Sequence, residues 1–207
     1  MGDSLRELWD FNDLVATETR LRDALDSAVS DPDRAEILTQ LARVEGLRDR
    51  FDAGLALNDR AEQLAGSAPR PSIRVKLERG RLHRSSGLPE KAAPLFVSAF
   101  EQAVEHGELA LAADAAHMAA LVDDMETWTQ RGLEIANGST DPGVTRWAGP
   151  LYNNLGWDRY DHGDFEGALQ AFEAALREYQ KPPDRPAEVQ IAREAVEEAR
   201  RALTPYS

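Results

Sequence analysis

The sequence contains no cysteine and few aromatic residues. None of its 207 residues is a cysteine, and phenylalanine, tryptophan and tyrosine together make up only 7%. A chain without thiols forms no disulfide, offers no cysteine ligand to a metal and has no thiolate nucleophile. This composition excludes disulfide-stapled scaffolds and thiol enzymes, and it favours a reducing compartment such as the cytoplasm.

Long apolar runs are missing as well. No segment approaches the roughly 20 consecutive apolar residues that a membrane-spanning helix needs. The stretch from Met1 to Phe11 carries three acidic side chains and lacks the basic-then-apolar order of a secretory signal peptide. We therefore expect a cytoplasmic protein with no membrane partner.

Positive charge is scarce. The chain has 24 lysine and arginine residues against 37 aspartate and glutamate residues, which gives a net charge of -13. Such a chain repels the phosphate backbone of nucleic acids and the headgroups of anionic membranes. We therefore expect no nucleic-acid partner.

Motifs for catalysis and for metal binding are also missing. The sequence has no glycine-rich phosphate loop, no Gly-x-Ser-x-Gly elbow and no His-Glu-x-x-His pair. Its four histidines lie far apart, and none has a histidine partner at helical metal-ligand spacing. We expect no enzymatic activity, no metal and no cofactor.

What the chain does contain is helical apolar spacing along nearly its whole length. Leu21, Leu25 and Val29 recur at steps of four, which places them on one face of a helix. Glycine- and proline-rich breaks, such as 66–71 and 181–186, divide the pattern into short segments. It predicts an all-α protein of about ten helices, each roughly 13 to 18 residues long, packed antiparallel across short loops.

One segment shows a specific repeat pattern. Residues 151–176 read LYNNLGWDRYDHGDFEGALQAFEAAL, with small residues at Gly156, Ala168 and Ala175 where two helices can cross closely. Large residues fill the space beside these crossings at Tyr152, Leu155, Phe165 and Phe172. This order of large, small, turn, small and aromatic residues resembles the tetratricopeptide repeat (TPR) family. Arg159 departs from the family, which usually has a tyrosine there.

The same phase recurs more weakly along the chain, and the small residue of each first helix falls at Ala42, Gly80, Ala116 and Gly156. The resemblance implies a single domain over residues 1–207, folded as a right-handed α–α superhelix. Its predicted parts are a leading helix (12–29), repeat 1 (35–68), repeat 2 (72–106), a degenerate repeat 3 (108–138), repeat 4 (147–180) and a capping helix (186–203).

Basic residues are concentrated in one predicted repeat. From Arg70 to Lys91 there are seven basic and two acidic residues, so this segment has a net charge of +5 within an acidic chain. In the TPR family the first helix of each pair lines a concave groove. Matching Gly80 to the family's small residue implies that Arg74, Arg81 and Arg84 face that groove.

The residue after each small residue is expected to face the groove too, and neighbouring positions add amide and aromatic side chains. The full candidate set is Arg43, Arg74, Arg81, Arg84, His117, Asn153, Asn154, Trp157 and Tyr160. Guanidinium groups bind carboxylates through paired hydrogen bonds, asparagine can bond a peptide backbone, and aromatic rings offer rigid contact area. The resemblance therefore implies a protein-interaction scaffold that binds a protein or peptide with an acidic stretch or a C-terminal carboxylate.

Alternatives remain for these charged and aromatic residues. The groove arginines could instead pair with nearby carboxylates such as Glu45, Glu78 or Asp114. Trp157 is expected to be substantially exposed unless the C-terminal part of the chain covers it.

Alternatives remain for the function as well. Trp9 and Phe11 either pack onto the first repeat or form an exposed patch for self-association, and the 186–203 helix could also join two copies into a homodimer. An enzyme or a small-molecule sensor is the least favoured possibility.

Overall fold

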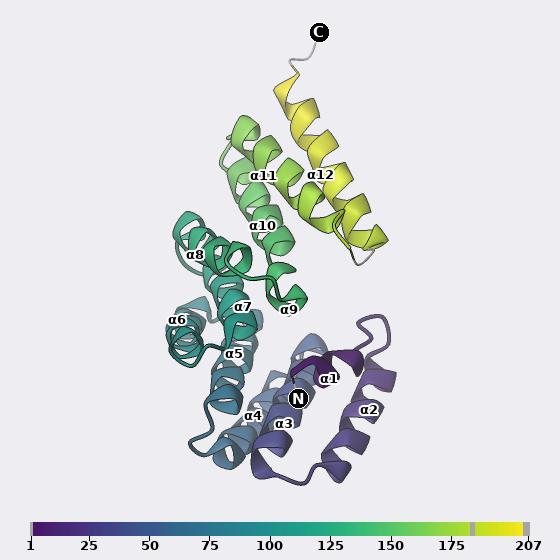
Figure 1. Ribbon diagram of the computed structural model, residues 1–207, viewed down its shortest axis with the longest axis vertical. Helices are drawn as coiled ribbons and strands as arrows, with labels where there is room; N and C mark the ends of the chain where they lie inside the picture. The colour runs from purple at the N-terminus through teal and green to yellow at the C-terminus, as the bar shows by residue number, and fades with distance from the viewer. Residues whose placement is uncertain (1, 183–184, 205–207) are drawn as a thin grey trace. The chain divides into compact units, whose positions relative to one another are not determined.

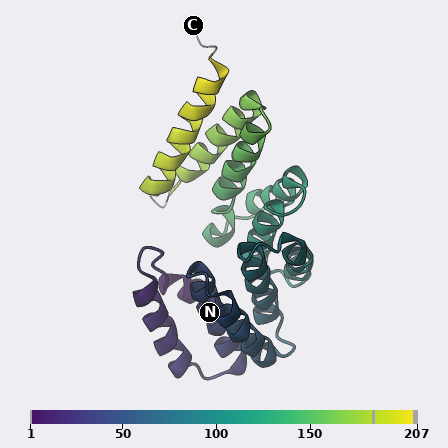
Figure 2. The same ribbon diagram turned by 180° about the vertical axis from the view of Figure 1, so that it is seen from behind.

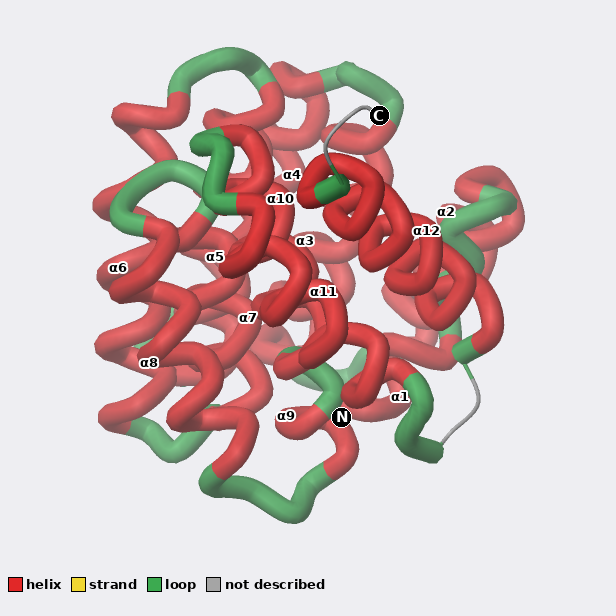
Figure 3. The backbone as a smooth tube through the Cα atoms, turned by 90° about the horizontal axis from the view of Figure 1, so that it is seen from above, coloured by secondary structure: helices red, strands yellow, loops and turns green. Residues whose placement is uncertain are grey.

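The structure is a computed structural model that describes residues 2–182 and 185–204. Within these residues the regular elements are all helices, joined by short loops (Figure 1, Figure 3). They are α1 (Gly2–Glu7), α2 (Leu14–Ser27), α3 (Asp31–Leu47), α4 (Phe51–Ala65), α5 (Pro69–Ser85), α6 (Pro89–Glu105), α7 (Leu109–Ala120), α8 (Met125–Asn137), α9 (Pro142–Thr145), α10 (Ala148–Asp161), α11 (Phe165–Tyr179) and α12 (Pro186–Leu203).

The all-α prediction with antiparallel helix pairs is confirmed. The sequence patterns do not predict the two shortest helices, α1 and α9. The chain divides into two compact units, Met1–Met118 and Ala119–Ser207. The first holds α1 to α6 and most of α7, the second holds α8 to α12, and each unit is described by itself.

The turn between α10 and α11 shows how local sequence reverses the chain. Gly163 has a φ of 82°, a left-handed conformation that glycine adopts without steric cost. Asp164 then begins the next helix by accepting a hydrogen bond from the backbone N–H of Gly167 at 2.9 Å. This turn and cap let α11 run back along α10.

A glycine in one helix and an aromatic ring in the next hold two of the pairs together. A Cβ atom added to Gly80 would lie 2.4 Å from Cε1 of Phe96, and one added to Gly156 would lie 2.4 Å from Cδ1 of Phe172. Both rings are completely buried. The close helix crossing that the sequence predicts at Gly156 is therefore present, and the ring of Phe172 fills it.

The first helix pair replaces the aromatic ring with an amide. Phe96 and Phe172 each stand sixteen residues after their glycine, and the residue sixteen positions after Ala42 is Asn58. Asn58 is completely buried, and its Nδ2 donates a hydrogen bond of 3.1 Å to the backbone carbonyl of Val75 in α5. A polar bond between α4 and α5 thus takes the place of ring packing at this position.

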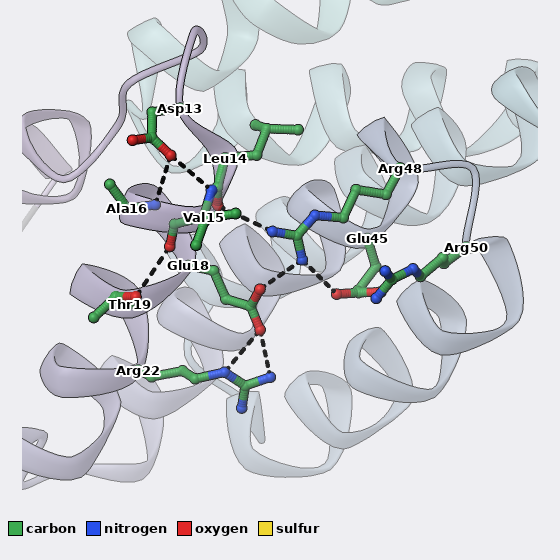
Figure 4. Close-up of polar contacts among 10 residues, drawn as sticks. All are labelled: Asp13, Leu14, Val15, Ala16, Glu18, Thr19, Arg22, Glu45, Arg48 and Arg50. Atoms are coloured by element: carbon green, nitrogen blue, oxygen red, sulfur yellow. Dashed lines mark hydrogen bonds and ion pairs between the residues drawn. The ribbon is translucent and has the colours of Figure 1, made fainter.

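The leading helix α2 is fastened to α3 by Arg48. Its Nη1 atom donates to Glu18 of α2 at 2.5 Å, and its Nη2 atom donates to the carbonyl of Leu14 at 3.2 Å (Figure 4). Glu18 also accepts from Arg22 at 2.8 Å, while Arg48 lies 3.4 Å from Glu45. Hydrogen bonds from Arg48 and Arg22 lower the pKa of the Glu18 carboxyl, so this carboxylate stays charged at neutral pH.

In the second unit, α12 lies beside α11 (Figure 1, Figure 2). Small residues of α12, among them Ala195 and Ala199, pack against Ala168 and Phe172 of α11 in one buried cluster. The 186–203 segment thus covers an apolar face of α11, as expected of a capping helix.

We expect Gly156→Ala to destabilise the second unit. Overpacking a core costs roughly 1–3 kcal/mol, whereas alanine in place of glycine inside a helix gains only about 0.5–1 kcal/mol. The free energy of unfolding, measured by urea titration, should therefore fall. Phe172→Leu introduced together with Gly156→Ala should recover part of that loss. An unchanged or higher free energy of unfolding in Gly156→Ala would contradict the close crossing.

We expect Arg48→Met to loosen α2 from α3, because the thioether keeps much of the apolar stem and loses the charged bonds to Glu18. Backbone amides of α2 should exchange with deuterium about tenfold faster, as loss of one charge-assisted bond implies. Arg22→Met is the matched control, since Arg22 bonds the same carboxylate from within α2. Equal exchange rates in both variants would mean that Arg48 does not fasten the helix.

Candidate peptide-binding face

The structure brings five of the nine candidate residues together in the first unit, on α3, α5 and α7. They are Arg43, Arg74, Arg81, Arg84 and His117. We call the surface that they share the α3–α5 face. Some of its arginines are hydrogen-bonded to carboxylates of the first unit, whereas others keep hydrogen-bond donors without a described partner.

Arg74 belongs to the internally bonded residues. Its Nε donates to the buried carboxylate of Glu36 on α3 at 3.0 Å, and only 15% of its side chain is exposed. Arg70 approaches the other oxygen of Glu36 at 3.5 Å and also pairs with Glu108. The charge of Arg74 is therefore neutralised inside the first unit.

Arg81 is held more firmly still. It donates hydrogen bonds to Glu78 and Asp114, both of which are buried. Burial alone would lower the pKa of the Arg81 guanidinium, but the charges of Asp114 and Glu78 outweigh it and raise that pKa. Burial acts to raise the pKa of Asp114, but Arg81 lowers it below its ordinary value. The pairing of groove arginines with carboxylates is thus observed for Arg81, with the partners that the sequence suggested.

Arg43 has an ion-pair partner but no hydrogen bond to a carboxylate of the described residues. Its nearest carboxylate oxygen belongs to Glu78, 3.8 Å away, and Glu78 is already bonded to Arg81. The Arg43 guanidinium lies 5.7 Å from the ring centre of Trp9 and 5.8 Å from that of Phe11, and makes no hydrogen bond to another described residue. Burial and the charge of Arg81 lower its pKa. Arg43 thus keeps donors for an anion.

Arg84 lies at the edge of a pocket of about 190 Å³ that Arg43 also lines. It is exposed, and no ion pair or hydrogen bond joins its guanidinium to another residue in the described part of the chain. The apolar lining comes from Leu47, Leu82 and Met118. A small apolar pocket with two available guanidinium groups at its rim can hold an apolar side chain beside a carboxylate.

His117 projects from α7 close to this network. It is half-buried, and burial lowers the pKa of its imidazole to about 4. Asp114 acts to raise that pKa, while the positive charges of Arg81, Arg43 and Arg84 lower it. The ring is neutral at physiological pH.

The other four candidates lie on α10 of the second unit. Trp157 is half-buried, 4.9 Å from the ring centre of Phe172 and in contact with the cluster that contains Ala195 of α12. Trp157 is thus partly covered, by a cluster to which α11 and α12 both contribute. The ring of Tyr160 packs edge-on against Trp157 at 5.6 Å.

Asn153 and Asn154 are half-buried on the same helix. The Oδ1 atom of Asn153 is buried and accepts no hydrogen bond from the described residues. It is the one candidate on α10 with a free acceptor shown by the structure. The proposed role of Asn153 in binding a peptide backbone stays a prediction.

Sequence reasoning missed Glu36 and the part that Trp9 and Phe11 play beside Arg43. A signal for the polar face was present, because Glu36, Gln40 and Arg43 recur at steps of four and three in a helix whose neighbouring residues are apolar. No comparable signal exists for the ring contacts, since they join residues more than thirty positions apart. Of the two alternatives for Trp9 and Phe11, Trp9 packs onto the core cluster of the first unit, whereas Phe11 is exposed.

The described residues contain no group of three or more histidine, aspartate or glutamate side chains placed to hold a metal ion. Across the same residues, every helix is too short or too polar to cross a membrane.

The low pKa of His117 predicts a pH-dependent stability. An unfolded histidine binds its proton near pH 6.5, so between about pH 6.5 and 4 the unfolded chain binds more protons than the folded one. Above pH 6.5, His117 should not change the free energy of unfolding. As the pH is lowered from 6.5 to about 4, this free energy should fall by up to roughly 3 kcal/mol. Urea midpoints measured from neutral to acidic pH should show a smaller fall in His117→Gln. Parallel profiles for both proteins would contradict the buried neutral imidazole.

Comparison with known proteins adds the following. Residues 149–182 match the family model described as "Tetratricopeptide repeat". The comparison with curated proteins finds no match. The crystal structure of BtubC (BKLC) from P. vanneervenii is similar, with a TM-score of 0.70 and 18% sequence identity over 91% of this chain and 84% of that chain.

At this identity the similarity to BtubC shows the fold alone. The TPR resemblance seen at 151–176 is confirmed by the family match, and the other repeat boundaries stay predictions. Residues 149–182 are a tetratricopeptide repeat, and the chain has an all-α fold of antiparallel helix pairs similar to that of BtubC.

Proposed function

We propose that this chain is a scaffold or adaptor that binds a partner protein through a peptide segment carrying a carboxylate. Tetratricopeptide repeats generally serve as protein-interaction scaffolds. The observation that carries the finer proposal is the pocket lined by Arg43 and Arg84, because both guanidinium groups keep donors that no other described residue uses. A carboxylate in an acidic segment or at a peptide C-terminus would supply the acceptors.

The size of the pocket favours a peptide over a small molecule. At about 190 Å³ it is smaller than the roughly 300–1,000 Å³ of typical small-molecule sites. One apolar side chain fills such a space, and the rest of the ligand then lies across the surface. Because Arg74 and Arg81 are bonded to carboxylates within the first unit, the proposal gives the charged contacts with the ligand to Arg43 and Arg84 and a structural role to Arg74 and Arg81.

The α10 residues enter the proposal through Asn153. Its Oδ1 atom has no partner among the described residues but is buried, so the Asn153 side chain would have to turn outward to accept a backbone N–H of an extended peptide on the second unit. Trp157 and Tyr160 support the shape of α10 through ring packing and add contact area where they are exposed.

Self-association is the second candidate. Phe11 in the first unit and Ile191 on α12 are both more than half exposed, at 63% and 55%. Exposed apolar side chains of this size can pair two copies of a chain.

The test selects ligands from a random peptide library displayed on phage, with the full chain as bait. Wild-type protein should enrich peptides rich in aspartate and glutamate, and Arg84→Glu should weaken binding of the best peptide by roughly tenfold or more. Arg60→Glu is the matched control, since it makes the same charge change at an exposed position of α4 outside the pocket. Circular-dichroism melts should be the same for both variants.

Equal binding by Arg84→Glu and Arg60→Glu would overturn the proposal, as would a selection without acidic enrichment. Light scattering of the same samples at several concentrations addresses the second candidate. A concentration-dependent dimer that Phe11→Ala abolishes would favour self-association.

A further inference from the structure

The segment between α1 and α2 lies outside the helix pairs and is nevertheless fixed to α3. The indole Nε1 of Trp9 donates to Oε1 of Gln40 at 3.0 Å, and Leu8 and Trp9 pack against the core cluster of the first unit. Its backbone is bonded on both sides of Trp9, because Arg20 donates to the carbonyl of Leu8 at 2.8 Å and the N–H of Asp10 donates to Thr17 at 2.8 Å. Hydrogen bonds and apolar packing therefore hold the segment in a defined position within the first unit.

This segment presents one aromatic ring to solvent. Phe11 stacks on Trp9 with ring centres 4.9 Å apart and an interplanar angle of 19°. Trp9 is half-buried, whereas 63% of Phe11 is exposed. An exposed ring held in place by a buried one loses little conformational freedom when it contacts a ligand.

The two rings also place Arg43. Its guanidinium lies within 6 Å of both ring centres, at the distance of a cation–π contact. Aromatic faces attract the cation but leave its N–H donors unused, whereas the nearest carboxylate, Glu78, is engaged by Arg81. Arg43 is thus held in place while its hydrogen-bond donors stay unused.

Arg43 also lines the 190 Å³ pocket. There Leu47, itself half exposed, stands beside Leu82 and Met118. Three arginines and one glutamate are the charged residues of the lining, so the local charge is positive. Ser85 offers the only uncharged polar side chain in this lining.

We infer that the Leu8–Phe11 segment is a wall of the binding site, and that the site takes an internal peptide segment in which an apolar residue stands next to an aspartate or glutamate. The apolar side chain enters the pocket beside Leu47, the side-chain carboxylate accepts hydrogen bonds from Arg43, and the Phe11 ring covers the residue that follows. This inference rests on the proposed function. It adds that the Leu8–Phe11 segment contacts the ligand and that the ligand is an internal peptide segment with an apolar residue next to an acidic one.

The experiment uses the best peptide from the library selection, synthesised with acetylated and amidated ends, and measures its affinity by titration calorimetry. Phe11→Ala should weaken binding about fivefold, as expected for loss of one aromatic contact, and Arg43→Gln should weaken it about tenfold. Val15→Ala is the control, because Val15 is an apolar residue of the same region that is 70% exposed and does not line the pocket.

Changes in the peptide test the ligand chemistry. Replacing its acidic residue by the corresponding amide, or its apolar neighbour by alanine, should each reduce affinity, while a free C-terminus should bind no better than the amidated end. A peptide that binds only with a free C-terminus would overturn the inference.

The two proposals fail differently. If Arg84→Glu abolishes binding while Phe11→Ala and Arg43→Gln bind like Val15→Ala, the inference is wrong and the proposed function stands. If no variant changes binding, both are wrong. Should Arg43→Gln prove unfolded in its circular-dichroism spectrum, Phe11→Ala alone decides, because Phe11 is exposed.

Discussion

The buried carboxylate of Glu78 is the constraint on which the chemistry of the first unit depends. It lies on α5 with 2% of its surface exposed, and it bonds Arg81 while standing 3.8 Å from Arg43. Glu78 hydrogen-bonds Arg81, which also bonds Asp114, and it faces Arg43 only as a longer ion pair, so the guanidinium donors of Arg43 stay unused. A buried ion pair of this kind is costly to break, because the remaining charge would have no partner. The fold therefore fixes which arginine of this pair keeps its donors.

The positive charge along α5 consequently has two roles. Arg74 and Arg81 join α5 to carboxylates on α3 and α7, and thereby tie neighbouring helix pairs together. Arg84, one turn beyond Arg81, keeps its guanidinium in solvent beside the pocket. The arginines of α5 look alike in the sequence, but in the fold some hold helices together and one is available to a ligand. The difference depends on whether a carboxylate lies close enough to bond each arginine.

The sequence predicts local features well and long-range contacts poorly. The crossing of α10 and α11 follows from Gly156 and Phe172, because their spacing and the turn at Gly163 are contained in one short segment. The buried partner of Arg74 is Glu36, thirty-eight positions away, and that contact depends on how two helix pairs pack. The same holds for Trp9 and Arg43, whose proximity requires the leading segment to fold back onto α3. The α3–α5 face could be located from the repeat phase, but its free donors could not.

The most direct test of this account observes the four arginine side chains separately during binding. Side-chain Nε–H resonances of Arg43, Arg74, Arg81 and Arg84 can be followed by NMR while the selected acidic peptide is added. The account predicts that the Arg43 and Arg84 signals shift with the peptide while those of Arg74 and Arg81 stay in place. Shifts at Arg74 and Arg81, with Arg43 and Arg84 unmoved, would contradict it.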